Sequence, residues 1–185
     1  MFLRITAGRL KGRRLTVPGT LVRPTEEKVR AAFFNTLYAL KEFEGSVFLD
    51  LFAGSGAVGV EALSRGCRKA VFVDRDRRTL SHLQGQLVLL DVAAAAEILC
   101  ADSFAATLKD KLTEPADIIF IDPPYDQRGR LPGLVRRCIE ERLVTGDGIL
   151  AVESDAALPG EIAGWNGKEK RYGGTFLTFY TGGAV

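Results

Sequence analysis

From residue 46 to residue 152, short apolar runs alternate with longer segments of helical periodicity. The predicted strands are 47–51, 70–73, 98–100, 117–121 and 148–152, and the predicted helices run from a Gly-rich turn to Arg65, over 77–90 and over 131–143. Apolar strands that are joined through helices form parallel sheets with right-handed crossovers. The pattern therefore predicts an α/β fold of Rossmann type, with a doubly wound and mostly parallel sheet. Such sheets bind ligands at the carboxyl ends of their strands.

The segment before this alternation has a different character. Residues 2–7 and 13–17 are β-prone and are separated by Gly8–Gly12, which predicts a small hairpin. Thr25 then precedes two acidic residues and a run of apolar positions at helical spacing, so we predict a helix over about 26–43. Together these elements predict an N-terminal extension over residues 1–44.

The C-terminal segment also departs from the alternation. Residues 170–172 and 175–180 are β-prone and lie on either side of Gly173-Gly174, a pair that favours a tight turn. We predict a closing antiparallel hairpin there. It completes a second domain over residues 45–185.

The basic side chains are unevenly distributed along the chain. Residues 1–24 contain six of them and no acid, whereas the rest of the chain carries 19 basic and 23 acidic side chains. The net charge of +2 therefore conceals a basic arm on a mildly acidic body. This asymmetry favours a polyanionic partner that binds at one end, and a solvated hairpin with scattered arginines is the alternative.

The cysteine usage indicates a reducing compartment. Cys67, Cys100 and Cys138 are widely spaced and odd in number, which argues against a disulfide framework and a zinc site. Each is interpreted as a small buried hydrophobe. The N-terminus lacks the layout of a signal peptide, and no apolar run reaches membrane-spanning length. We expect a cytoplasmic monomer that binds neither a metal ion nor a membrane.

A Gly-rich motif follows the first predicted strand of the alternation. Gly54, Gly56 and Gly59 form a G-x-G-x-x-G pattern that opens a helix, and Asp74 ends the next strand twenty residues after Gly54. In nucleotide-binding folds such glycines allow a tight turn and close backbone approach, and the acid accepts hydrogen bonds from ribose hydroxyls. A Gly-rich turn that only permits close helix–sheet packing is the alternative.

An acidic residue in front of this loop discriminates between cofactors. Asp50 ends the first strand, where a carboxylate would repel a pyrophosphate but attract the ammonium and sulfonium groups of S-adenosylmethionine. Asp102 ends the third strand and could accept from an adenine amino group, with Phe104 covering the ring. Alternatively, Asp102 caps the short helix that follows. The predicted cofactor-binding residues are Asp50, Phe52, Gly54, Ser55, Gly56, Gly59, Asp74, Arg75, Asp102, Ser103 and Phe104.

A second motif, Asp122-Pro123-Pro124-Tyr125, follows the fourth predicted strand without a gap. Two prolines cannot continue a central strand, so the strand stops and exposes its last residues. An exocyclic base nitrogen is a poor nucleophile because its lone pair is delocalised into the ring. Acceptors at Asp122 and at the Pro123 carbonyl would draw both amine protons and free that lone pair, while the prolines hold these acceptors rigidly. Tyr125 could stack on a base taken out of its helix. All four residues are therefore predicted to be catalytic.

Both motifs resemble those of the class I methyltransferases. There, the pattern seen here as Asp50-x-Phe52-x-Gly54-x-Gly56 holds S-adenosylmethionine, and Asp or Asn followed by Pro-Pro and an aromatic residue holds the target amine. Across nearly its whole length the chain is also similar to the RsmD family. The segments that carry this similarity are Arg4–Gly8, Gly12–Leu15, Arg23–Thr25, Val29–Asn35, Asp50–Gly56 and Glu61–Gly66.

The resemblance implies a specific substrate. RsmD enzymes methylate the N2 amino group of one guanosine in bacterial 16S ribosomal RNA, on assembled or assembling small ribosomal subunits. It also implies that the basic hairpin and the segment after it lie near the RNA. The RNA-binding residues so implied are Arg9, Lys11, Arg13, Arg14, Arg23 and Thr25.

Three alternatives stay open on the sequence. A DNA or other RNA amino-methyltransferase, acting on adenine N6 or cytosine N4, would use the same chemistry. DNA enzymes of this kind usually carry a large recognition domain, whereas only about 45 residues precede the first strand of the predicted parallel sheet. A non-catalytic RNA-binding assembly factor would be favoured by loss of Asp122 or of the glycines, and both are present. A nicotinamide dehydrogenase lacks evident hydride-transfer residues, because His82, the single histidine, falls within a helix and is interpreted as a packing or surface residue.

Overall fold

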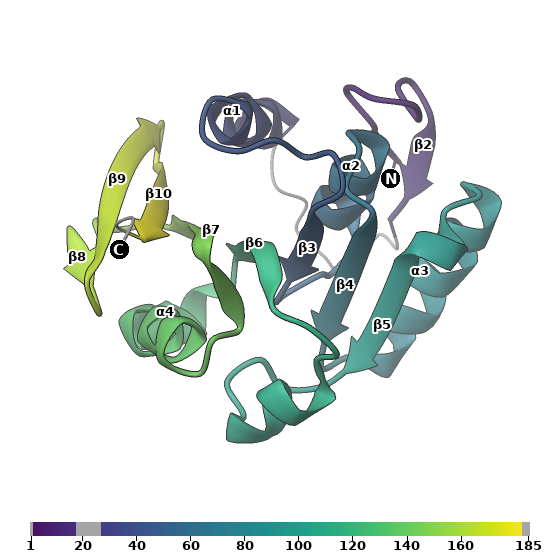
Figure 1. The fold of residues 1–185 in the computed structure, drawn as a ribbon. Coiled ribbons are helices and arrows are strands. Elements are labelled where there is room, and N and C mark those ends of the chain that lie inside the picture. The colour runs from purple at the N-terminus through teal and green to yellow at the C-terminus, as the bar shows by residue number, and fades with distance from the viewer. Residues whose placement is uncertain (1, 18–26, 183–185) are drawn as a thin grey trace. The chain divides into compact units, whose positions relative to one another are not determined.

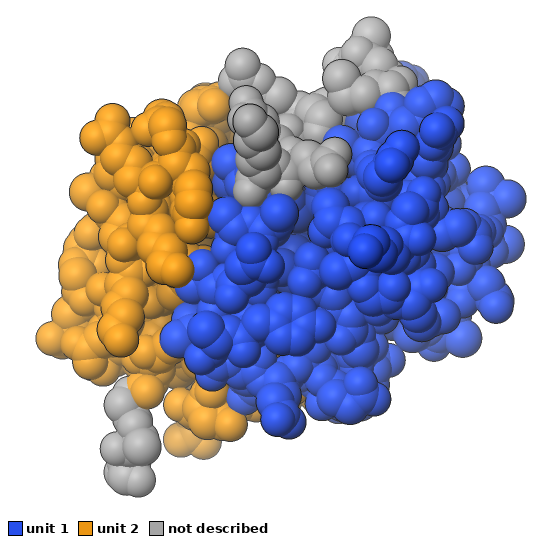
Figure 2. Space-filling view, turned by 90° about the horizontal axis from the view of Figure 1, so that it is seen from above, with its two compact units in different colours: residues 1–103 blue, residues 104–185 orange. Residues whose placement is uncertain are grey.

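The computed structural model describes residues 2–17 and 27–182. The chain divides into two compact units, Met1–Ser103 and Phe104–Val185, which are coloured separately in Figure 2. The first unit therefore contains the N-terminal extension together with the Gly-rich loop. The second contains the Asp-Pro-Pro-Tyr segment.

The first unit is built on three parallel strands, β3 (Val47–Asp50), β4 (Lys69–Asp74) and β5 (Ala96–Cys100), in the order β5-β4-β3 (Figure 1). Helix α2 (Ala57–Ser64) joins β3 to β4, and α3 (Arg77–Leu89) followed by the short 3-10 helix η1 (Ala93–Ala95) joins β4 to β5. The strands are parallel, so all three end at the same edge of the sheet. The residues that were predicted to bind the cofactor lie at or next to this edge, except Phe104, which belongs to the second unit.

The N-terminal elements are shorter than the sequence predicts. Strands β1 (Phe2–Arg4) and β2 (Arg14–Thr16) pair antiparallel, and helix α1 (Glu27–Tyr38) ends five residues before the predicted boundary. The helix stops because the chain turns back and buries Phe43. The Phe43 ring lies 5.8 Å from that of Phe34 and 4.7 Å from that of Tyr38. Packing of an apolar side chain thus overrides the helical periodicity.

The second unit combines parallel and antiparallel strands. Strand β6 (Ala116–Ile121) runs parallel to β7 (Val144–Ser154), and β7 is followed in the sheet by β10 (Thr175–Gly182), β9 (Trp165–Tyr172) and β8 (Glu161–Ile162), each antiparallel to its neighbour. Strands β7 and β9 are longer than predicted, because Val144 of β7 pairs with Ala116 of β6 and pairing along β10 reaches Ser154 of β7 and Trp165 of β9. Strand β8, which pairs with β9, was not predicted.

Helices of the second unit lie between these strands in the sequence. The 3-10 helix η2 (Ala106–Lys111) precedes β6, and the 3-10 helix η3 (Tyr125–Arg130) leads directly into α4 (Leu131–Glu140). Helix α4 buries Leu131, Leu134, Val135 and Cys138, whose spacing places them on one face of a helix. The predicted fold class, an α/β fold with a mostly parallel sheet and C-terminal antiparallel strands, is confirmed.

None of the helices that the structure describes is long and apolar enough to cross a membrane. Among residues 2–17 and 27–182, no group of three His, Cys, Asp or Glu side chains is placed to hold a metal ion.

Candidate active site

The Gly-rich loop is fixed by the acid that ends the next strand. The Gly54 amide donates to Oδ2 of Asp74 at 2.9 Å, and Oδ1 of Asp74 accepts from the Asp76 amide at 2.9 Å. Gly54 has a φ of +50°, a conformation that L side chains adopt with strain. A carboxylate has about four acceptor positions, so Asp74 can order the loop and still accept from a ribose hydroxyl.

Two further glycines of the motif are required by packing. Gly56 has a φ of +75° and precedes α2, and a Cβ there would lie 2.3 Å from Leu83. Gly59 lies within α2, where a Cβ would meet the ring of Phe72 on β4 at 2.3 Å. Gly59 therefore brings the helix close to the sheet, as the packing alternative requires, while Gly54 and Gly56 shape the loop itself.

The residues around the end of β3 carry negative charge in a buried place. The side chain of Asp50 is only 2% exposed, and Phe52 next to it is partly exposed. The buried Ser103 donates its hydroxyl to the Leu51 carbonyl, which ties the segment after β5 to the end of β3. A carboxylate attracts positive charge most strongly in a buried place, so this site suits a positively charged ligand group such as a sulfonium or an ammonium.

The remaining cofactor candidates lie at the same edge of the first unit or just after it. Asp74 and Ser55 belong to the loop region, and Arg75 and Asp102 are exposed at the ends of β4 and β5. The helix after Asp102, η2, has Ala105 as its N-cap and no side-chain cap, so the interpretation of Asp102 as that cap is wrong. Asp102 thus remains a candidate acceptor at the carboxyl end of β5.

The Asp-Pro-Pro-Tyr segment leaves the end of β6 in the second unit. Pro123 is buried, and Pro124 is the N-cap of η3, where its carbonyl accepts from the Gln127 amide at 2.9 Å. The Tyr125 side chain is 58% exposed and the Asp122 side chain is 23% exposed. The turn therefore holds a carboxylate and an aromatic ring at the end of a buried strand, where both are accessible.

An arginine that sequence reasoning missed contacts both of these side chains. The Arg128 guanidinium lies 3.6 Å from Oδ1 of Asp122 and 3.4 Å from Oδ2 of Asp155, with its Cζ 3.8 Å from the centre of the Tyr125 ring. No motif singles out Arg128, because its partner Asp155 is distant in sequence. The 3-10 turn that places it over Tyr125 could not be foreseen either.

Phe104, predicted to cover an adenine ring, lies at the start of the second unit. Arg137 Nη1 donates to its carbonyl at 2.7 Å, and the Arg130 guanidinium stacks over its ring with 3.8 Å between Cζ and the ring centre. Helix α4 and the end of η3 thus fix the position of Phe104. The ring is partly exposed.

The basic hairpin is anchored at the far end of helix α2. The Arg9 amide donates to the Ser64 carbonyl at 2.8 Å, and the Leu10 amide donates to Oγ of Ser64 at 2.9 Å. Arg13 donates from Nη2 to the Leu89 carbonyl, at the end of α3. Both helices begin at the cofactor edge, so the hairpin tip lies at the opposite end, about 12 Å along eight-residue α2.

The side chains of the hairpin are available to a partner. Arg9, Lys11, Arg13 and Arg14 are all exposed. The other two RNA-binding candidates, Arg23 and Thr25, lie outside the described residues. His82 packs against the hairpin rather than at the cofactor edge, with Nε2 2.8 Å from the Thr16 carbonyl oxygen.

The cysteine prediction is partly wrong. Cys67 and Cys138 are buried as expected, and burial raises the pKa of the Cys138 thiol to about 12. Cys100 is exposed, because it ends β5, the strand at the edge of the sheet. A small apolar residue at a strand end need not be covered.

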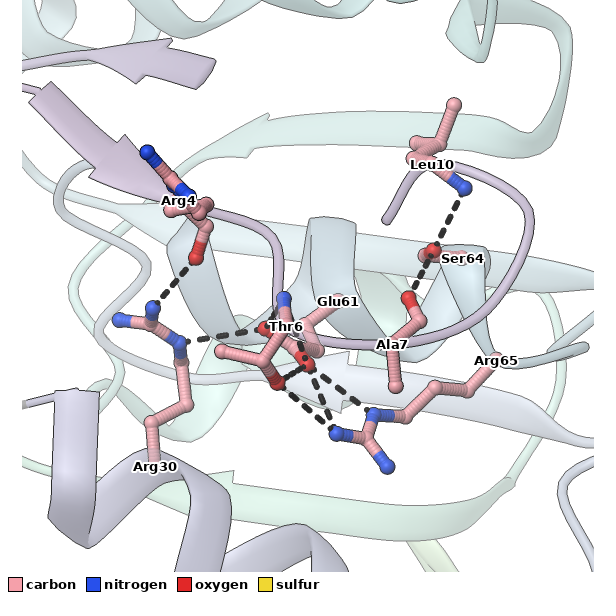
Figure 3. A network of polar contacts seen from close by, with 8 residues as sticks. All are labelled: Arg4, Thr6, Ala7, Leu10, Arg30, Glu61, Ser64 and Arg65. Carbon is pink, nitrogen blue, oxygen red and sulfur yellow. Dashed lines mark hydrogen bonds and ion pairs between the residues drawn. The ribbon is translucent and has the colours of Figure 1, made fainter. Parts of the chain in front are cut away.

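A buried polar network joins the N-terminal extension to α2 (Figure 3). Glu61 accepts from the Thr6 amide at 3.2 Å and from its hydroxyl, and it pairs with Arg30 at 3.3 Å and with Arg65 at 2.8 Å. The Glu61 and Arg30 side chains are fully buried. Of these contacts the sequence signals only the i,i+4 pair of Glu61 and Arg65.

The chain is similar to known proteins in sequence and in fold. The solved structure of yhhF from Escherichia coli superimposes with a TM-score of 0.83 and 30% identity, and each chain covers 100% of the other. YlbH of Bacillus subtilis is 37% identical over 155 residues, 83% of each chain. The "Ribosomal RNA small subunit methyltransferase D" of Escherichia coli K12 is 33% identical over 167 residues, 89% of this chain and 81% of that protein.

These similarities define the class of the protein. Its fold is that of the class I methyltransferases. The family model described as "Conserved hypothetical protein 95" matches residues 3–181. The chain therefore belongs to this family, the RsmD-type methyltransferases.

Proposed function

We propose that this protein transfers a methyl group from S-adenosylmethionine to the N2 amino group of a guanosine in the 16S ribosomal RNA of the bacterial small subunit, assembled or assembling. The observation that carries the proposal is the Asp122–Tyr125 turn, which holds a carboxylate and an exposed aromatic ring at a strand end. Family membership and the named small-subunit methyltransferase of Escherichia coli support ribosomal RNA as the substrate class.

Each residue of the turn has a separate task. Asp122 accepts a hydrogen bond from one amine proton and the Pro123 carbonyl accepts from the other, so the nitrogen lone pair is freed for attack. Tyr125 stacks on the base that carries the amine. Because the prolines fix φ, the acceptors are preorganised and need little reordering in the transition state.

The first unit supplies the cofactor site. Asp50 faces the cationic groups, the loop at Gly54 and Gly56 allows close backbone approach, and Asp74 accepts from the ribose. Asp102 and Phe104 are proposed to bind the adenine. The bound cofactor presents an activated methyl group on a sulfonium, and placement of the amine in line with it is the main contribution of the protein.

A DNA amino-methyltransferase and a non-catalytic assembly factor are the competing functions. Purified protein with labelled S-adenosylmethionine is offered small subunits, naked ribosomal RNA and duplex DNA, and the products are digested to nucleosides. We expect label as N2-methylguanosine from the small-subunit RNA. Label on adenosine or cytidine, or in DNA, would overturn the substrate, and no label in any acceptor would favour the assembly factor.

A further inference from the structure

The geometry points to Arg128 as a positioning residue that orients both Asp122 and Tyr125 for methyl transfer. This inference rests on the proposed function, since it concerns the same amine site. Arg128 lies in η3, three residues after Tyr125, and all of its contacts described above fall within the second unit. No motif of the chain assigns it a role.

The first observation is that Arg128 is held in place. Its side chain is only 11% exposed, and two carboxylates from different segments flank it, Asp122 after β6 and Asp155 after β7. Ile121 pairs with Val152 in the parallel register of these strands, so the two segments leave the sheet at the same edge. A guanidinium fixed between two anchors loses little further entropy when it orients a third group.

The second observation is the stacking on Tyr125. With Cζ 3.8 Å from the ring centre, the guanidinium covers one face of the ring, yet the Tyr125 side chain remains 58% exposed. The uncovered face is therefore the one available to a base. An exposed tyrosine on a short 3-10 turn would otherwise sample several rotamers, and a stacked cation on one face restricts it.

The third observation concerns charge. Asp122 follows β6 and Asp155 follows β7, and Arg128 forms ion pairs with both carboxylates. Its contact with Asp122, 3.6 Å, is longer than a charge-assisted hydrogen bond of about 2.7–2.9 Å. Arg128 thus attracts the Asp122 carboxylate, 23% of which stays exposed and so accessible to an amine.

These observations give Arg128 a role that no other described arginine of the second unit shares. Arg130 stacks on Phe104, and Arg136 pairs with Glu140 on the surface at 3.5 Å. Arg136 is 56% exposed and touches neither motif residue, so Arg136→Ala is the matched control. Arg128→Lys keeps the charge but loses the planar group, and Arg128→Gln keeps a similar length without the charge.

The kinetic experiment compares Arg128→Ala, Arg128→Lys and Arg136→Ala on the acceptor that the parent protein methylates. Misplacement by about 1 Å can cost about 100-fold, so we expect Arg128→Ala to lower kcat by roughly 10- to 100-fold. The KM for S-adenosylmethionine should stay within about threefold, since the cofactor is bound elsewhere. Arg128→Lys should recover part of the loss, and Arg136→Ala should match the parent. A kcat within threefold of the parent, or a loss confined to the cofactor KM, would overturn the inference.

A second readout does not depend on any methyl acceptor. The chain has four tyrosines, so protein labelled with fluorotyrosine should give four ¹⁹F resonances, and Tyr125→Phe identifies the one from Tyr125. We expect Arg128→Ala to shift and narrow that resonance, while Arg136→Ala leaves it unchanged; Arg128→Gln replaces the alanine variant if the latter does not fold. An unchanged resonance would show that Arg128 does not hold the ring. If the parent methylates no acceptor, the proposed function fails, and this spectrum still decides the role of Arg128.

Discussion

Each unit has a cluster in which arginine pairs with a carboxylate, but the carboxylate is fully buried in the first unit and partly exposed in the second. In the first unit Glu61 accepts from a backbone amide, a hydroxyl and two guanidinium groups, and neither Glu61 nor Arg30 is exposed. In the second unit Asp122 meets Arg128 at 3.6 Å and keeps 23% of its side chain exposed. The Glu61 carboxylate is fully buried among its donors, whereas the Asp122 carboxylate lies beside Arg128 and remains partly exposed.

The difference agrees with the separate roles of the two carboxylates under the proposed function, in which Glu61 holds the fold together and Asp122 binds the substrate. Burial of an ion pair stabilises a protein only when every donor and acceptor is satisfied, which the Glu61 network achieves. It ties the N-terminal hairpin and α1 to α2, the helix that begins at the cofactor loop (Figure 3). A carboxylate that accepts hydrogen bonds from a substrate must be accessible, so the partial exposure of Asp122 agrees with the proposed role.

The largest effect on stability is expected from Glu61→Ala. Removal of this carboxylate leaves Arg30 buried without its partner, and breaking a buried pair costs about 3–5 kcal/mol. Urea unfolding should show a midpoint lowered accordingly. The matched control is Glu140→Ala, whose side chain is 58% exposed and whose loss should change stability by less than about 0.5 kcal/mol. Equal midpoints for the two variants would show that the network does not hold the extension in place.

Asp122→Ala should lower activity and leave stability unchanged, the reverse of Glu61→Ala. Loss of one preorganised acceptor should lower kcat by about 10²–10³-fold, or about 2.7–4 kcal/mol, by analogy with removal of an oxyanion-hole donor. Unfolding by urea and the affinity for S-adenosylmethionine should stay close to those of the parent. Asp122→Asn keeps one acceptor oxygen and should retain more activity than the alanine variant. Near-full activity of Asp122→Ala would remove the amine-binding mechanism.

The sequence predicted the parts of this comparison that depend on local pattern. Period and turn chemistry located the central strands, the Gly-rich loop, Asp74 and the end of β6, because these features lie within a few residues of each other or at a motif's fixed spacing. The fold class and the family were predicted correctly on that basis and from resemblance.

What the sequence did not predict depends on contacts between distant segments. Arg128 meets Asp155 only because β6 and β7 are neighbours, and Thr6 meets Glu61 only because the hairpin packs on α2. The sequence likewise did not predict that the hairpin tip packs on the end of α2. Its strands could be recognised from β propensity, but the hydrogen bonds from Arg9 and Leu10 to Ser64 that fix its tip are tertiary.

The smallest predicted effect concerns RNA binding by the basic side chains at the hairpin tip. The tip lies at the end of α2 away from the cofactor loop, so Arg9, Lys11 and Arg13 are placed to contact the RNA backbone rather than the target base. Replacing all three with alanine should reduce affinity about tenfold at moderate salt, since each lost phosphate contact lowers the slope of log K against log salt by about 0.7–0.9. The kcat at saturating RNA should not change, because the amine site is untouched.

The control removes the same charge from another surface. Lys168, Lys170 and Arg171 are exposed on β9 of the second unit, and their triple alanine variant should leave the salt slope close to that of the parent. Filter binding of small-subunit RNA over a series of salt concentrations gives both slopes. Since the two variants have equal net charge, a different slope must come from where the charge lies. Equal slopes for both variants would mean that the hairpin attracts RNA only through the overall field of the protein, and the basic extension would then have no contact role of its own.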